Sequence, residues 1–204
     1  MKSSNRIAMA ATLTGLLAVA PTAFAQSGGT TSGSMSKTTT SKTMTTTSTS
    51  KLSASDKKFV TNAAVGGMEE VQLGQLAAQK ASDSDVKNFG QRMVDDHSKA
   101  NDQLKQVASQ KGVTVPSTLP PSKQKDIDKL NKLNGAAFDK AYVSMMVQDH
   151  KKDVAEFQKE SKSGKDTDVK GFAANTLPTL QDHLKMIQDI SAKMHPTKMS
   201  KKGK

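Results

Sequence analysis

The feature that most constrains the fold is the spacing of apolar residues after Ser53. Charged and apolar residues are mixed at three- and four-residue intervals from there to about residue 195, with almost no β-branched alternation. This spacing is typical of amphipathic α-helices, each with one apolar stripe to bury. Helices of this kind bury their stripes against one another. We therefore expect one all-α domain over residues 53–195, most simply a four-helix bundle.

Helix-capping residues, glycines and prolines divide this domain into four long helices and one short helix. The long helices are expected over about 56–81, 86–112, 135–163 and 166–195. A Pro-rich connection over 113–121 precedes the short helix, which is predicted over 122–133. This connection is long enough to carry the chain back along the bundle. Pro178 lies inside the last helix, where it predicts a kink or a local break.

The N-terminal part of the chain has the composition of a targeting segment and a linker. Residues 1–25 place Lys2 and Arg6 before an apolar run and end in Ala-Phe-Ala, as secretory signals do. We predict cleavage after Ala25 and a periplasmic or secreted mature protein. Residues 26–52 are nearly all Ser, Thr, Gly and Lys, which predicts a disordered tether. Residues 196–204 are expected to form a basic flexible tail.

Charge and cysteine content limit the classes of partner and chemistry. The formal net charge of +11 favours weak association with anionic envelope surfaces, whereas nucleic acid is not an expected partner of an exported protein. A solvated lysine-rich helix surface explains the same charge. The chain has no Cys, which excludes disulfides and thiolate chemistry. Nothing in the sequence indicates an oligomeric state.

Helical wheels place one polar residue of each long helix on its apolar face. At about 100° and 1.5 Å per residue, these residues point inwards near the middle of their helices. They are Glu70, His97, His150 and His183. Antiparallel helices keep their midpoints level, so the four side chains are expected to converge. The neighbouring Glu69 is expected to point sideways.

Two interpretations of this cluster remain open. Three imidazoles and a carboxylate are a normal ligand set for a zinc, copper or iron ion. Additional or supporting groups within one helical turn would be Asp153, Asn101, Met93 and Met146, although the methionines are also ordinary core residues. Alternatively, the four residues form a closed hydrogen-bond network without metal, since buried polar groups need partners.

Several stretches of the chain resemble the DUF4142 family of exported bacterial proteins, which has no known function. The resemblance is carried by residues 59–70, 73–77, 93–97, 138–142 and 177–183 and extends over most of 53–193. It implies a ferritin-like four-helix bundle with a long crossover connection. Many ferritin-like enzymes hold two irons through Glu-x-x-His pairs. Here an apolar residue stands three positions before each of the three histidines, so chemistry of that type is not expected.

These observations favour a bundle that binds one metal ion for storage, sensing or stress protection. The alternative is a structural or interaction protein of the cell envelope whose His/Glu network holds no metal. An enzymatic role has the least support. The sequence carries no activated nucleophile, phosphate-binding loop or nucleotide motif, and we assign no catalytic residues and no organic cofactor.

Overall fold

The computed structural model describes residues 51–195. Within this range it contains five α-helices and no strand: α1 (Ala54–Lys80), α2 (Ser84–Gln110), α3 (Pro121–Asn131), α4 (Gly135–Ser163) and α5 (Thr167–Met194). The all-α prediction is confirmed. The predicted signal segment, nearly all of the tether and the basic tail lie outside the described residues. None of the described helices has the length and apolarity to cross a membrane.

Local sequence signals explain where the helices begin and end. Ser53, Asp83 and Asp166 cap the N-termini of α1, α2 and α5 by accepting hydrogen bonds from backbone N–H groups of the first turn. Gly112 follows α2 with a φ of 65°, a conformation that glycine adopts without strain. The short helix α3 begins at Pro121, one residue earlier than predicted, because proline fits the first turn of a helix.

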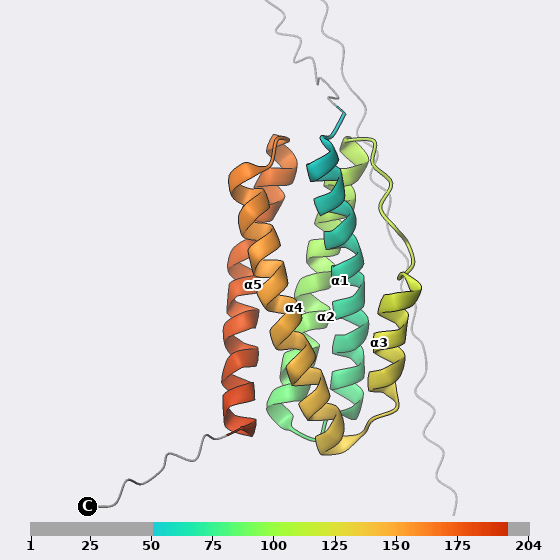
Figure 1. Ribbon diagram of the computed structural model, residues 1–204, viewed down its shortest axis with the longest axis vertical. Coiled ribbons are helices and arrows are strands. Elements are labelled where there is room, and N and C mark those ends of the chain that lie inside the picture. The colour runs from blue at the N-terminus through green and yellow to red at the C-terminus, as the bar shows by residue number, and fades with distance from the viewer. Residues whose placement is uncertain (1–50, 196–204) are drawn as a thin grey trace, which may run out of the picture. The chain divides into compact units, whose positions relative to one another are not determined.

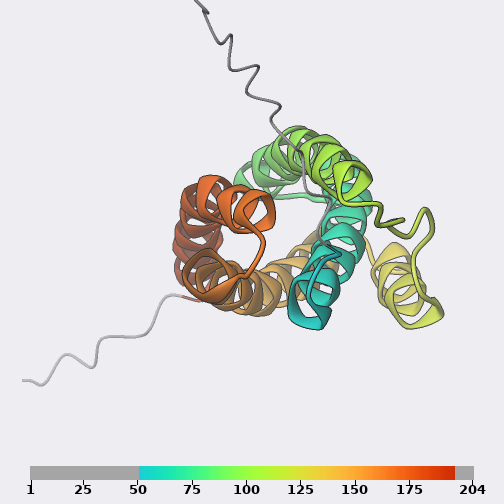
Figure 2. The same ribbon diagram turned by 90° about the horizontal axis from the view of Figure 1, so that it is seen from above.

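The four long helices enclose one core. Going round the bundle, α1 packs against α2, α2 against α5, α5 against α4, and α4 against α1 (Figure 2). In Figure 1, α1 and α5 run down the page, whereas α2 and α4 run up. The parallel pair α2 and α4 is joined by the long connection that includes α3, which is the predicted crossover. The helix α5 continues through Pro178, so the alternative of a local break was wrong.

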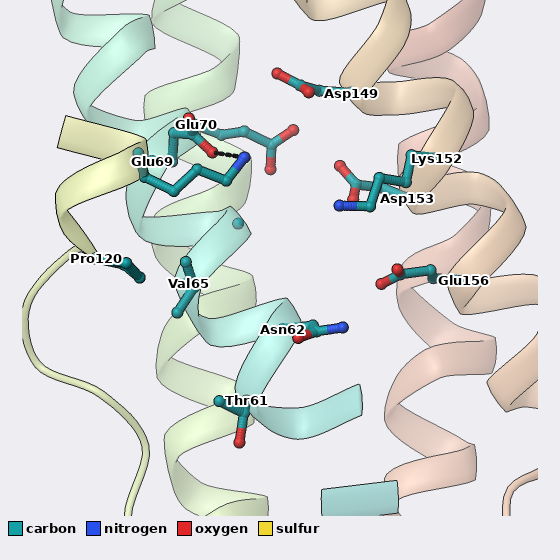
Figure 3. A pocket seen from close by; sticks show the side chains of 12 residues that line it. Thr61, Asn62, Val65, Glu69, Glu70, Pro120, Asp149, Lys152, Asp153 and Glu156 are labelled. Atoms are coloured by element: carbon teal, nitrogen blue, oxygen red, sulfur yellow. Dashed lines mark ion pairs between the residues drawn. The ribbon is translucent and has the colours of Figure 1, made fainter. Parts of the chain in front are cut away.

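The short helix α3 lies outside the bundle, against α1 and α4. Near its start, Lys123 Nζ lies 2.6 Å from Glu69 Oε2, an ion pair dashed in Figure 3. Glu69 points away from the histidines, as expected from the wheel, yet only 3% of it is exposed. We did not foresee this burial, because it depends on where the connection docks.

The core consists of two apolar clusters separated by a polar layer. One cluster surrounds Leu73, Phe89, Tyr142 and Ile187. The other surrounds Phe59, Leu104, Phe157, Phe172 and Leu180. In every long helix the inward polar residue falls between members of the two clusters: Glu70, His97, His150 and His183. The polar layer therefore crosses the middle of the bundle.

Two glycines bring α1 and α2 into backbone contact. A Cβ atom placed on Gly74 would lie 2.6 Å from the carbonyl oxygen of Gly90, and one placed on Gly90 would lie 2.8 Å from that of Gly74. Real side chains do not tolerate such distances, so only glycine fits at both positions. The contact lies one turn from Glu70 along α1.

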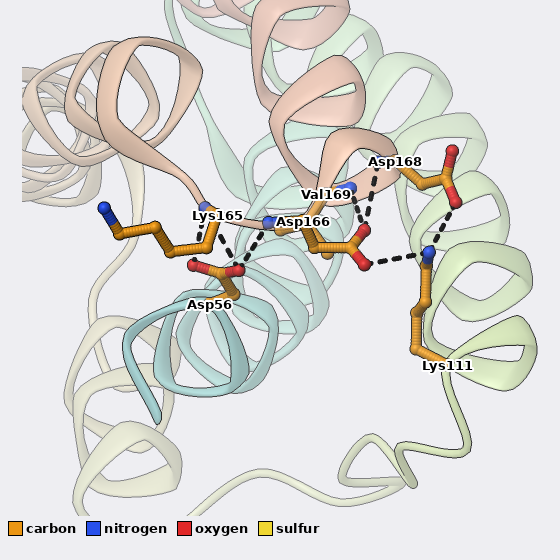
Figure 4. Close-up of polar contacts among 6 residues, drawn as sticks. All are labelled: Asp56, Lys111, Lys165, Asp166, Asp168 and Val169. Carbon is orange, nitrogen blue, oxygen red and sulfur yellow. Dashed lines mark hydrogen bonds and ion pairs between the residues drawn. The ribbon is translucent and has the colours of Figure 1, made fainter. Parts of the chain in front are cut away.

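One end of the bundle is held by carboxylates that bind loop backbone groups. Asp56 of α1 accepts hydrogen bonds from the backbone N–H groups of Lys165 and Asp166, at 3.2 and 2.8 Å (Figure 4). Lys111, after α2, pairs with Asp166 at 2.8 Å and with Asp168 at 2.6 Å. These contacts tie the α4–α5 loop to α1 and α2.

Candidate metal site

The structure brings the three predicted histidines together at the centre of the bundle. The ring centroids of His97, His150 and His183 lie 5.4 to 5.9 Å apart. Each residue offers one ligand atom, and these three atoms all lie within 4.8 Å of one another. His150 and His183 are fully buried and His97 is 5% exposed. The three side chains come from α2, α4 and α5, so an ion here would contact three helices.

One nitrogen of each histidine is held by a neighbouring oxygen. His97 Nδ1 lies 3.0 Å from Glu70 Oε2. His150 Nδ1 lies 3.0 Å from the backbone carbonyl oxygen of Met146. His183 Nε2 lies 2.9 Å from Asp96 Oδ2. Oxygens of this kind accept a hydrogen bond from a protonated ring nitrogen, and they thereby fix the tautomer and the direction of the other nitrogen, as they do behind metal-binding histidines.

The other nitrogen of each ring has no partner among the residues that the structure describes. These buried atoms are His97 Nε2, His150 Nε2 and His183 Nδ1. If the held nitrogens carry the ring protons, each free nitrogen presents a lone pair. A buried polar atom without a partner costs about 1–3 kcal/mol. Three such atoms within one buried layer are energetically costly unless a further group contacts them.

Glu70 belongs to the same layer. Only 4% of it is exposed. Its Oε2 contacts His97, while its Oε1 has no hydrogen-bond partner within residues 51–195 and lies 3.6 Å from His150 Nε2. Glu70 therefore orients His97 through one carboxylate oxygen and places the other oxygen beside His150.

Burial keeps the charge of this layer low. It lowers the pKa of His97 and of His183 to about 4, and it also lowers that of His150. The three imidazoles are therefore neutral at neutral pH, the state in which they bind metal ions. Burial raises the pKa of Glu70 to about 7, in spite of the opposing effect of His150.

The remaining predicted residues take different places. Asp153 lies beside Glu70, and burial together with the Glu70 charge raises its pKa well above the ordinary value. Asn101 lines a small cavity next to His97. Met93 and Met146 are fully buried members of the apolar cluster, which is the packing role left open for them. Met146 also contributes its carbonyl oxygen to the site.

Sequence reasoning missed Asp96. This residue precedes His97 on α2 but points towards α5, where it holds His183. Its own position is supported by Arg92, whose Nε donates to the same carboxylate oxygen at 3.1 Å. Burial raises the pKa of Asp96, but the hydrogen bond with His183 and the Arg92 charge outweigh this effect and lower it overall. The available signal was the Arg92–Asp96 spacing of four residues, which marks an ordered carboxylate.

Comparisons with known proteins support the fold. The family model described as a domain of unknown function (DUF4142) matches residues 41–190. A DUF305 fragment from Deinococcus radiodurans has a TM-score of 0.62 at 10% identity, and the match covers 71% of this chain and 99% of that one. A DUF305 protein from Streptomyces coelicolor, described as a candidate secreted protein, gives 0.58 at 14% identity, with 69% and 93% covered.

A third solved structure, a candidate spore coat protein from Bacillus halodurans, has a TM-score of 0.56 at 14% identity. The match covers 71% of this chain and 90% of that one. No curated protein matches the sequence. At these identities the three structures indicate the same helical fold and nothing about the site.

Proposed function

Because this chain belongs to the DUF4142 family, which is defined without a function, we propose its role from the buried site. The protein binds a single transition-metal ion, zinc, copper or iron, through His97, His150 and His183. Glu70 orients His97 and offers its free oxygen as a fourth ligand. Two observations support this proposal: one ligand nitrogen from each of the three rings lies within 4.8 Å of the other two, and each ring has one buried nitrogen without a partner among the described residues.

The pattern of held and free nitrogens supports a metal more than a closed network. In a closed network every ring nitrogen would have a donor or an acceptor opposite it, because unpaired buried groups are costly. Here one nitrogen of each ring is satisfied and the other is not. A metal ion can accept all three lone pairs at once, whereas no described residue donates a hydrogen bond to any of these nitrogens.

The donor set narrows the choice of ion. Neutral imidazole with a carboxylate suits zinc, copper(II) and iron, whereas thioether ligands would favour copper(I). Because Met93 and Met146 pack in the apolar cluster, we place zinc and copper(II) ahead of copper(I). The apolar residue three positions before each histidine also argues for one ion rather than a di-iron pair.

We place this activity outside the cytoplasm, on the basis of the signal-like residues 1–25. A role in metal storage, sensing or envelope stress fits a site that is buried and lacks assigned catalytic groups. The basic composition supports weak contact with anionic envelope surfaces and gives no reason to expect nucleic acid as a partner.

A second candidate is a structural or interaction protein without metal. The contacts of Glu70 with His97 and of Asp96 with His183 favour it, because both pairs would persist in a metal-free bundle. The two candidates differ in what the free nitrogens do.

Native mass spectrometry of untagged, metal-stripped protein separates them. After addition of zinc or copper(II), we expect one ion per chain in the wild type. His97→Gln, His150→Gln and His183→Gln should each abolish or strongly weaken retention. His195→Gln is the matched control, since His195 is exposed after the end of α5. Absence of any bound ion in the wild type, or equal retention in all four variants, would reject the metal proposal.

A further inference from the structure

An acidic cleft opens along the seam between α1 and α4, beside the start of α3. Its volume is about 270 Å³. Five carboxylates and two lysines line it: Glu69, Glu70, Asp149, Asp153, Glu156, Lys123 and Lys152. Figure 3 shows the carboxylates of α4 facing those of α1. This excess of carboxyl groups over lysines stands out in a chain whose formal net charge is +11.

The cleft shares part of its lining with a second space, which lies beside His97. A smaller cavity of about 20 Å³, large enough for one water molecule or ion, is lined by His97 and shares Gly66, Glu70 and Asp153 with the cleft. Gly66 leaves room at this junction because nothing lies within 4 Å of the position that a Cβ atom would occupy. One glycine and two carboxylates therefore line both spaces.

The burial and free oxygen of Glu70 independently indicate that the inner end of the cleft can bind a cation. Glu70 is 4% exposed, lines both spaces and keeps Oε1 without a hydrogen-bond partner among the described residues. An oxygen in this state is a ready ligand for a cation. The same carboxylate contacts His97 and lies beside His150, so it connects the cleft to the histidine layer.

We infer that a hydrated divalent cation reaches the three histidines through this cleft and past Gly66, and that Glu70 and Asp153 receive it before the histidine nitrogens do. The inference rests on the proposed metal site and adds its access route. Acidic walls raise the local concentration of cations and so speed their arrival, an effect that salt weakens. Lys123 and Lys152 oppose it.

Charge variants at the outer part of the cleft test the route through the rate of metal loading. The probe is Co²⁺ mixed with metal-stripped protein in a stopped-flow absorbance experiment. Glu156→Gln should slow loading and Lys152→Gln should speed it, each about three-fold at 0.01 M ionic strength and less at 0.15 M. Neither change should alter the final affinity greatly. Asp102→Asn, an exposed charge on α2 outside the cleft, should leave the rate unchanged.

A steric variant tests the junction. Gly66→Leu should slow loading at least as much as Glu156→Gln does, because the new side chain fills the space between cleft and cavity. Gly171→Leu is the matched control, since Gly171 on α5 also has nothing within 4 Å of its Cβ position and lines neither space. Thermal melting followed by circular dichroism checks that the two leucine variants fold. If Gly66→Leu does not fold, the smaller substitution Gly66→Ala takes its place.

The outcomes separate the two proposals. If wild-type protein binds Co²⁺ and its loading rate responds to the cleft variants with the stated signs, the route is supported. If Co²⁺ binds normally but substitutions at Glu156, Lys152 and Gly66 do not change the loading rate, the proposed route is wrong and the proposed metal site still stands. Failure of the wild type to bind Co²⁺, zinc or copper(II) would overturn both.

Discussion

Replacing His150 by leucine should stabilise the metal-free protein and abolish its stabilisation by metal. His150 is fully buried, so leucine of similar volume can take its place against Phe89, whose ring centroid lies 5.9 Å from the imidazole. The change removes one unpartnered nitrogen. Among residues 51–195, His150 makes one side-chain hydrogen bond, to the Met146 carbonyl oxygen, which also belongs to the backbone hydrogen-bonding pattern of α4.

The magnitude follows from these two contacts. Removing a buried nitrogen without a partner gains about 1–3 kcal/mol, and losing the hydrogen bond to Met146 costs about 1 kcal/mol. The net gain in the free energy of unfolding is about 0–2 kcal/mol without metal, or up to about 8 °C in melting temperature. With zinc at 100 times its dissociation constant, the wild type gains about 2.7 kcal/mol and the variant gains little.

Thermal and urea denaturation, followed by circular dichroism with EDTA and with zinc, measure both effects. The order of stability should reverse: His150→Leu equals or exceeds the wild type in EDTA, and the wild type exceeds His150→Leu in zinc. A loss of about 3 kcal/mol or more in EDTA, together with a wild type that does not respond to zinc, would refute this reasoning. That result is what a closed hydrogen-bond network predicts.

Asp56→Asn should cost about 1–3 kcal/mol at neutral pH, because the carboxylate accepts two loop N–H groups in a buried position. Burial raises the pKa of Asp56, but these backbone hydrogen bonds outweigh that effect and lower the pKa from 3.8. The stabilisation is therefore complete above about pH 5 and is lost as the pH falls below 3.8. Urea denaturation between pH 2 and 7 should show the stabilities of the wild type and the variant converging in acid. Gly74→Ala should lower the melting temperature because its Cβ meets a backbone oxygen at 2.6 Å, whereas Gly171→Ala should leave it unchanged or raise it. Deleting residues 26–51 should leave the melting temperature nearly unchanged, since that segment has few apolar groups that could pack against the bundle. Mass spectrometry of the exported protein should find Gln26 at the N-terminus.

The inward positions of the site could be predicted because they depend on single helices. A period of 100° per residue decides that His97 faces the core, whatever lies on the other side. Nearly equal helix lengths then bring His150 and His183 to about the same level. Both steps need only the sequence of each helix and the antiparallel packing of neighbours.

The groups around the histidines depend on helix order and docking, which the periodicity does not contain. Asp96 reaches His183 only because α2 is next to α5 in the bundle. Glu69 is buried only because the crossover places Lys123 against it. For the same reason the acidic cleft could not be foreseen, since α1, α3 and α4 each supply part of its lining.

The contact between Gly74 and Gly90 fixes the vertical alignment of two functional side chains. Glu70 lies four residues from Gly74, about 6 Å along α1, and His97 lies seven residues from Gly90, about 10 Å along α2. Helical side chains lean towards the N-terminus of their own helix. In this antiparallel pair they lean towards each other, which closes the difference of about 4 Å. The close approach of Gly74 and Gly90 thus sets the distance between the Glu70 carboxylate and the His97 imidazole.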